Sequence, residues 1–147
     1  MSHPQADLVL AVAHHLLAFC FAGTLAFEIA VATPDLTAPG IRRLARAAAC
    51  GGVLWIALPA VGFSRAVLAA KGWDFYSANP FFWAALAAFA AVLLLAIVTA
   101  VEIGRWRRDT KKFATSTPCR EDVLAVRRLL WLEAAALAPV LVLAVCV

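Results

Sequence analysis

Four long apolar stretches dominate the sequence, at about residues 8–32, 44–70, 81–103 and 123–147. Each is at least as long as the ~20 residues that a helix needs to cross the hydrocarbon core of a bilayer, and none has the wide polar stripe of a soluble amphipathic helix. The chain is 65% hydrophobic and 15% charged, whereas a soluble domain is about half apolar and a quarter charged. We therefore predict an all-α integral membrane protein, an antiparallel four-helix bundle that forms a single transmembrane domain over residues 1–147.

The basic residues gather in two of the three segments between these stretches. The first segment carries Arg42, Arg43 and Arg46, and the third, a basic loop at residues 104–122, carries six lysines and arginines. The second segment has only Lys71, offset by a neighbouring aspartate. By the positive-inside rule the two arginine-rich segments face the cytoplasm. Both termini are then expected on the outer side, which is the periplasm for a bacterial inner membrane.

Two adjacent histidines, His14 and His15, lie in an otherwise apolar run of the first span. Side chains at adjacent helix positions point ~100° apart, so the two imidazoles cannot face the same target. An imidazole there either ligates a heme or relays protons, or it hydrogen-bonds across helices near the lipid headgroups. His3 is the only other histidine and Met1 the only methionine. One protomer therefore offers at most a five-coordinate heme, unless a dimer partner supplies the second ligand.

Two glutamates lie inside the predicted spans. Glu133 is about two to three turns into the fourth span, deep enough to require a partner. It is expected to be either a proton acceptor or the partner of a basic residue on another span. Glu28 lies near the inner end of the first span, on the same side as Arg42, Arg43 and Arg46. We expect Glu28 to form a structural ion pair with these arginines.

Several polar residues follow one another at the outer end of the second span: Arg65, Lys71, Tyr76 and Asn79. They lie on the same side of the membrane as the histidine pair. An Arg/Lys/Tyr cluster beside an imidazole can hold the carboxylates of a porphyrin or the carbonyl of a quinone. The alternative is that each residue only anchors its helix at the membrane interface.

Five motifs in this order give the chain a family resemblance: "HHLLAF" at 14–19, "RRLARA" at 42–47, "GFSR" at 62–65, "KGWDFYSANPFFW" at 71–83 and "RRLLWLE" at 127–133. The chain resembles a family of small four-span bacterial membrane proteins catalogued as a domain of unknown function. This resemblance covers nearly the whole chain. It implies a topology and a bacterial inner-membrane location, and it implies no reaction.

More loosely, the layout is similar to that of the HemJ-type protoporphyrinogen oxidases, which are small heme-binding membrane proteins. Those proteins have a histidine in an early span, a tryptophan followed by a lysine opening a later span, and an Arg…Glu…Pro pattern in the last. The corresponding features here are His14 or His15, Trp83, and Arg128 with Glu133 and Pro139. Alanines follow Trp83, so the lysine that can hold a porphyrin carboxylate is missing.

Two hypotheses follow for the function. In the first, a redox membrane protein binds heme b or another porphyrin with His14 and His15 as metal ligands, while Arg65 and Tyr76 position the ligand and Glu133 handles protons. In the second, the chain is a non-catalytic accessory or structural subunit that packs against a larger membrane complex. The expected partners are the lipid bilayer and either a second copy or a larger membrane complex. No nucleic-acid partner is expected.

Overall fold

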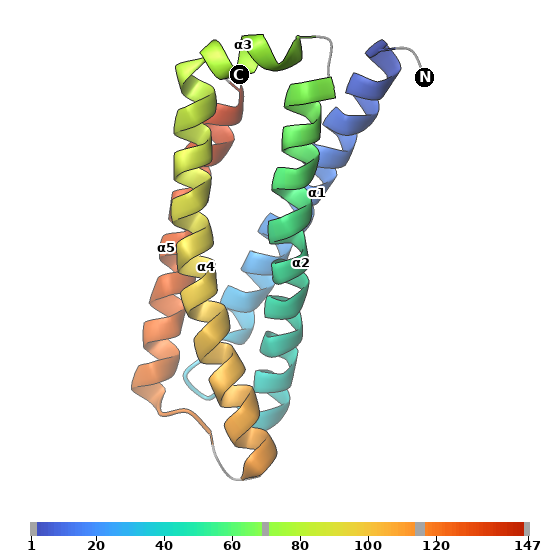
Figure 1. The fold of residues 1–147 in the computed structure, drawn as a ribbon. Coiled ribbons are helices and arrows are strands. Elements are labelled where there is room, and N and C mark those ends of the chain that lie inside the picture. The colour runs from blue at the N-terminus through green and yellow to red at the C-terminus, as the bar shows by residue number, and fades with distance from the viewer. Residues whose placement is uncertain (1–2, 69–70, 114–116, 146–147) are drawn as a thin grey trace.

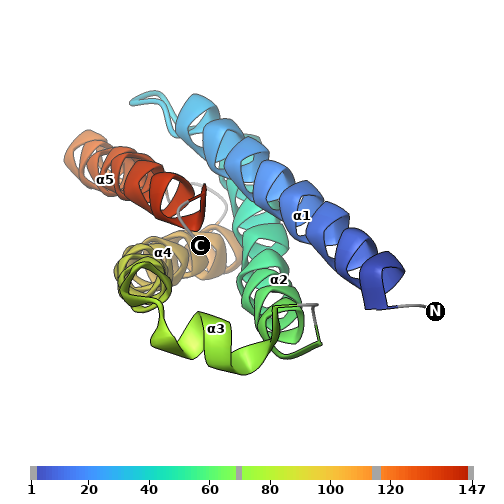
Figure 2. The ribbon, with the colours of Figure 1, turned by 90° about the horizontal axis from the view of Figure 1, so that it is seen from above.

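The computed structural model describes residues 3–68, 71–113 and 117–145. This part of the chain folds into five helices: α1 (His3–Val31), α2 (Ala38–Leu68), α3 (Gly72–Ala78), α4 (Pro80–Lys112) and α5 (Arg120–Val145). The four long helices run alternately up and down, and the short α3 lies across one end (Figure 1). Seen from that end they contact one another in the cyclic order α1, α2, α4, α5 (Figure 2). The predicted all-helical fold is confirmed.

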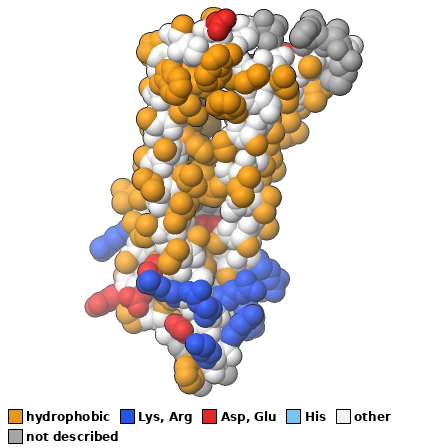
Figure 3. All heavy atoms as spheres, in the orientation of Figure 1, with side chains coloured by type: hydrophobic (Ala, Val, Ile, Leu, Met, Phe, Trp, Pro, Cys, Tyr) orange, Lys and Arg blue, Asp and Glu red, His pale blue; other side chains and the backbone are white. Residues whose placement is uncertain are grey.

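Three helices, α1 from Gln5 to Val31, α2 and α4, are long and apolar enough to cross a membrane. Their outward faces carry large apolar side chains: Phe19 and Ile56 are each 75% exposed. Figure 3 shows such side chains over the middle of the molecule and the α3 end, with lysines and arginines gathered near the opposite end. A soluble monomer rarely exposes so much contiguous apolar surface. The structure is therefore that of a membrane protein.

Two segments differ from the sequence-based expectation. Residues 104–112 were expected to begin a basic loop, yet they continue α4 to Lys112. Arginine and lysine have high helix propensity, so a basic composition does not itself end a helix. The segment between the second and third apolar stretches contains the unpredicted helix α3, which begins at Gly72 with a φ of +72°. Glycine adopts this left-handed conformation without the steric cost of a Cβ atom.

Hydrogen bonds fix the junction between α3 and α4. The side chain of Asn79 accepts a hydrogen bond from the Phe81 backbone N–H at 2.9 Å, and Pro80 occupies the first turn of α4. This is the helix start that the Asn-Pro sequence predicts. The indole N–H of Trp83 donates back to the Ser77 carbonyl at 2.9 Å. These bonds hold α3 across the ends of the long helices.

Two clusters of buried apolar side chains fill the interior at different levels. The larger lies toward the arginine-rich end and includes Ile41, Leu44, Ile103, Val123 and Leu130. The smaller is nearer α3 and is formed by Phe21, Val92 and Leu137. Polar side chains are buried as well, namely Glu28, Thr99 and Glu133. The interior is therefore not uniformly apolar.

Leu130 and Leu132 provide a matched test of this packing, because they lie two residues apart on α5 with exposed fractions of 0% and 56%. We expect Leu130→Ala to lower the free energy of unfolding by about 2 kcal/mol or more, since it leaves a cavity in the larger cluster. Leu132→Ala should change it by less than about 0.5 kcal/mol. Equilibrium unfolding in mixed detergent micelles measures both values, and equal losses would contradict the assignment of the core.

Candidate functional site

A cleft of about 210 Å³ lies among the long helices below α3. Its walls are mostly aliphatic and aromatic side chains from α1, α2, α4 and α5. The ionisable side chains that line it are His14 from α1, Arg65 from α2 and Tyr76 from α3. We call this the histidine cleft. The structure thus brings together three of the five residues that the sequence proposed for a site.

The histidine pair is divided between the cleft and the outer surface. His14 lines the cleft, whereas His15 is exposed and its Nδ1 lies 2.7 Å from the Ala11 carbonyl oxygen of the same helix. The two rings are nearly perpendicular, with centroids 6.1 Å apart. This separation follows from the ~100° between adjacent side chains on a helix. Only His14 is placed to meet a ligand in the cleft.

The ring of His14 packs against the backbone of α2 at a glycine. A Cβ atom added at Gly62 would lie 3.1 Å from Cε1 and 3.3 Å from Nδ1 of His14. Nδ1 is buried and forms no hydrogen bond with any described residue, although the Leu58 backbone lies nearby. Leaving a buried polar atom unpaired costs about 1–3 kcal/mol. The close packing at Gly62 thus covers Nδ1 and holds the imidazole of His14 at the wall of the cleft.

Arg65 is held beside the cleft by an ion pair with α1. Its Nε donates to Oδ1 of Asp7 at 3.3 Å, with each side chain about one-third exposed. The other guanidinium N–H groups form no hydrogen bond to the described residues and remain able to bind a carboxylate. Tyr76 is buried, with its ring centroid 5.4 Å from that of Phe75 and 5.8 Å from that of Phe82. A positive group and a phenol thus flank an otherwise apolar cleft.

Two other residues of the predicted outer cluster lie outside the cleft. The ammonium of Lys71 sits 4.4 Å from the centre of the Phe75 ring, and Asn79 caps α4. Both fit the alternative that the sequence offered, in which such residues anchor the ends of helices. Of the four polar residues that the sequence placed near the histidine pair, Arg65 and Tyr76 line the cleft and the other two do not.

A second cavity, of about 250 Å³, contains the two buried glutamates and is called here the carboxyl cavity. Glu28 on α1 and Glu133 on α5 are 7% and 3% exposed. The predicted ion pair of Glu28 is not formed: the ion pairs among the described residues are Arg65–Asp7 and Arg105–Glu102. Glu28 points into the interior, whereas the arginines at the start of α2 are all exposed. Glu133 likewise faces another acid rather than a basic residue.

Thr24 and Thr99 also line the carboxyl cavity, and sequence reasoning missed both. A usable signal was present for Thr24, which lies four residues before Glu28 and hence on the same face of α1. Gly51 faces Glu28 across the cavity, where an added Cβ atom would lie 3.7 Å from Oε1. The site is thus formed at a close approach of α1 to α2.

The two arginine-rich segments meet at the end of the molecule away from α3. Arg42 and Arg46 of α2 and Arg107 and Lys111 of α4 line a groove of about 130 Å³. The sequence required these segments to lie on one side, and the structure places them together. Among the residues described, no group of three or more His, Cys, Asp or Glu side chains could hold a metal ion.

The chain was also compared with protein families, curated proteins and solved structures. A family model described as "Predicted membrane protein (DUF2214)" matches residues 6–147. The chain belongs to this family. Membership in the DUF2214 family confirms the resemblance to an uncharacterised family of membrane proteins, while the similarity to HemJ-type oxidases stays a prediction. No curated protein and no solved structure matches the chain.

The contact between Gly62 and His14 can be tested with two glycines of α2. Glycine-to-alanine changes inside a helix stabilise by roughly 0.5–1 kcal/mol where space allows. An added Cβ atom at Gly52 meets nothing within 4 Å, whereas one at Gly62 meets the His14 ring at 3.1 Å. We expect Gly52→Ala to raise the free energy of unfolding. Gly62→Ala should not raise it, because the added Cβ atom crowds the His14 ring. Nitrogen NMR of labelled histidine should show a shifted His14 signal in Gly62→Ala alone, and identical behaviour of the two variants would contradict the contact.

Proposed function

We propose that this DUF2214 protein is a redox membrane protein that binds heme b or another porphyrin in the histidine cleft. The observation that carries the proposal is the position of His14 at the wall of an apolar cleft flanked by Arg65 and Tyr76. Histidine is a common axial ligand of heme iron. Aliphatic and aromatic walls with a few polar groups are typical of cofactor sites.

Each residue of the cleft has a stated part in this proposal. His14 would hold the heme iron, Arg65 would bind a propionate carboxylate, and the Tyr76 hydroxyl would orient the porphyrin. A bound heme supplies one-electron redox chemistry, and Glu133 accepts protons outside the cleft. The cleft is smaller than the ~300–1,000 Å³ of sites that enclose a drug-sized ligand. A porphyrin held there would therefore remain partly exposed to lipid.

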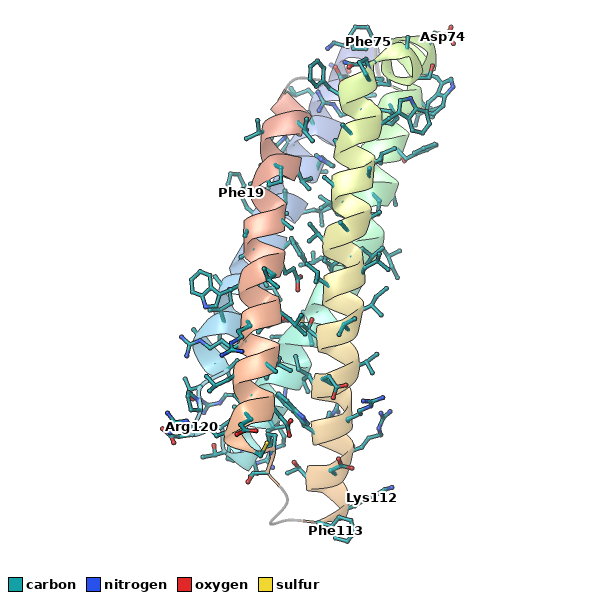
Figure 4. All side chains as sticks on the ribbon, turned by 90° about the vertical axis from the view of Figure 1, so that its left-hand side faces the viewer. Phe19, Asp74, Phe75, Lys112, Phe113 and Arg120 are labelled. Carbon is teal, nitrogen blue, oxygen red and sulfur yellow. The ribbon has the colours of Figure 1, made fainter. Side chains whose placement is uncertain are left out.

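The proposal includes a topology of four spans in a bacterial inner membrane. Helix α5 lies beside α1 and α4 and is proposed as the fourth span. Figure 4 shows Asp74 and Phe75 at one end of the molecule and Lys112, Phe113 and Arg120 at the other. The basic end is proposed to face the cytoplasm because arginine and lysine are retained there. Both termini then lie on the periplasmic side.

The test of the heme proposal is an absorption spectrum of protein purified in mild detergent and then mixed with hemin. We expect a Soret band, with α and β bands that sharpen on reduction by dithionite. His14→Ala should abolish these bands, while the matched variant His15→Ala should retain them because His15 lies outside the cleft. Loss of the bands in His15→Ala alone would contradict the assignment of the ligand.

A colourless wild-type protein that stays colourless with hemin would instead support the alternative of an accessory subunit. In that case a larger membrane complex should copurify with the chain. A homodimer that contributes a second ligand predicts a six-coordinate spectrum that depends on protein concentration.

Arg65 can be tested separately from its ion pair. Arg65→Ala should weaken hemin binding on the order of tenfold or more, since a hydrogen bond to a charged group contributes about 1.5–3 kcal/mol. Asp7→Asn breaks the ion pair and keeps the guanidinium, so it should leave binding within about threefold of the wild type. Titration of each variant with hemin measures both affinities. Equal losses would show that the ion pair, rather than the guanidinium, matters to the site.

The topology can be tested with cysteine labelling in intact bacterial cells. The starting variant keeps Cys119, which is exposed, and has serine at positions 20, 50 and 146. A membrane-impermeant maleimide should label Cys119 only after the cells are permeabilised. In a second variant with Cys119→Ser and Asp74→Cys, labelling should occur in intact cells. The reverse pattern would place the basic end outside.

A further inference from the structure

Two threonine hydroxyl groups line the carboxyl cavity, and each already donates its proton to the backbone of its own helix. The hydroxyl of Thr24 donates to the Cys20 carbonyl and that of Thr99 donates to the Ala96 carbonyl, both at 2.9 Å. Each hydroxyl proton is therefore committed to the helix backbone, and its oxygen can only accept from the cavity. Oε2 of Glu133 is buried and has no hydrogen-bond partner among the described residues. Trp55 also lines the cavity, but neither its indole N–H nor any other described group donates a hydrogen bond to Oε2 of Glu133, so this oxygen lacks a proton donor.

The cavity also lacks a positive charge to balance its acids. Glu28 of α1 and Glu133 of α5 are the titratable residues that line it. Helices α2 and α4 contribute aliphatic side chains, Trp55, two glycines and Thr99, none of which is charged. The two carboxyl groups are close enough to interact electrostatically. Two ionised carboxylates in such surroundings repel each other, and each also loses its hydration.

A single proton satisfies both deficits. When one carboxyl group is protonated, only one negative charge remains, and its O–H can donate to the other carboxylate directly or through water in the cavity. Hydrogen bonds of this O–H···O⁻ type are about twice as strong as neutral ones. The cavity of about 250 Å³, which is lined by two glutamates and two threonines among apolar side chains, also has room for water molecules, each of which occupies about 30 Å³ in the liquid.

We propose that Glu28 and Glu133 form a proton-binding site that holds one proton between α1 and α5. Glu133 was expected from the sequence to handle protons alone, whereas the geometry makes Glu28 an equal member of the site. The inference does not rest on a ligand in the histidine cleft. The cleft and the cavity share one lining residue, Phe21.

The test uses N,N′-dicyclohexylcarbodiimide, an apolar reagent that adds to protonated carboxyl groups. Wild-type protein in detergent is treated near neutral pH and its adducts are located by mass spectrometry. We expect a single adduct, on Glu28 or Glu133, and none in the Glu28→Gln, Glu133→Gln double variant. Glu102→Gln is the matched control because Glu102 is more exposed and paired with Arg105 at 2.6 Å. It should label like the wild type.

Single variants test whether the proton is shared. In Glu28→Gln the amide N–H can donate to the Glu133 carboxylate and replace the proton, so labelling of Glu133 should fall several-fold. Unchanged labelling of Glu133 in this variant would overturn the shared site. Circular dichroism confirms that each variant is folded, and the hemin spectrum of the double variant should match the wild type. Failure of this proposal is thereby separated from failure of the heme proposal.

A metal ion in the cavity is the competing occupant. Labelling is repeated with added sodium, calcium or magnesium chloride, and we expect no protection beyond the effect of ionic strength. Specific protection by one cation would overturn the proton site in favour of a metal site. Infrared spectroscopy gives a second readout: a protonated carboxyl C=O band, sensitive to D₂O, should be present in the wild type and absent in the double variant. Absence of both the adduct and the band in the wild type would overturn the proposal.

Discussion

Every polar side chain on an apolar helix must find its hydrogen bonds within the protein, because lipid offers none. Most of the buried or half-buried hydroxyl groups do so on their own helix. Thr24, Ser64 and Thr99 each donate to a carbonyl one turn earlier, at 2.8–2.9 Å. An ionised glutamate cannot use the same solution, because its carboxylate oxygens only accept hydrogen bonds. The half-buried His14 and the buried Glu28 and Glu133 are accordingly the side chains around which the two hollow sites are formed.

The packing of α1 against α2 provides the space for these side chains. His14 faces Gly62, and Glu28 faces Gly51 nearer the other end of the same antiparallel pair. Small residues let membrane helices approach closely, and here they also leave room for a large polar side chain on the facing helix. A Cβ atom at Gly62 would displace an imidazole, whereas one at Gly51 would meet Glu28 at an ordinary contact distance of 3.7 Å. The histidine site thus depends more strictly on glycine.

The sequence predicted the long helices well because their apolar length is a property of single segments. It also predicted that the arginine-rich segments meet, and that Arg65 and Tyr76 lie near the histidine pair. These predictions need only the side of the membrane on which each residue lies. The choice between His14 and His15 depends on the rotation of α1 about its axis. That rotation is set by contacts with α2 and is not encoded in the local sequence.

The same limit explains the two differences at the ends of the helices. Glu28 and the arginines of α2 are close along the chain, which suggested an ion pair, but Glu28 is buried in the interior whereas the arginines are exposed. Helix α3 has only 7 residues, too few for a hydrophobic period to be recognised, and its glycine and the following Asn-Pro resemble a loop. Its conformation is fixed by contacts with α4, such as the hydrogen bond from Trp83 to Ser77.

Phe21 separates the two hollow sites, since it is the residue that lines both. Its ring packs edge-on against Trp55 at 4.5 Å, and Trp55 in turn lies 5.1 Å from Phe89 of α4. Three aromatic rings from α1, α2 and α4 thus form a continuous apolar layer at this level. Aromatic side chains at this spacing pack closely and leave little room for water. The contacts of these three rings therefore place aromatic side chains of α1, α2 and α4 between the carboxyl cavity and the histidine cleft.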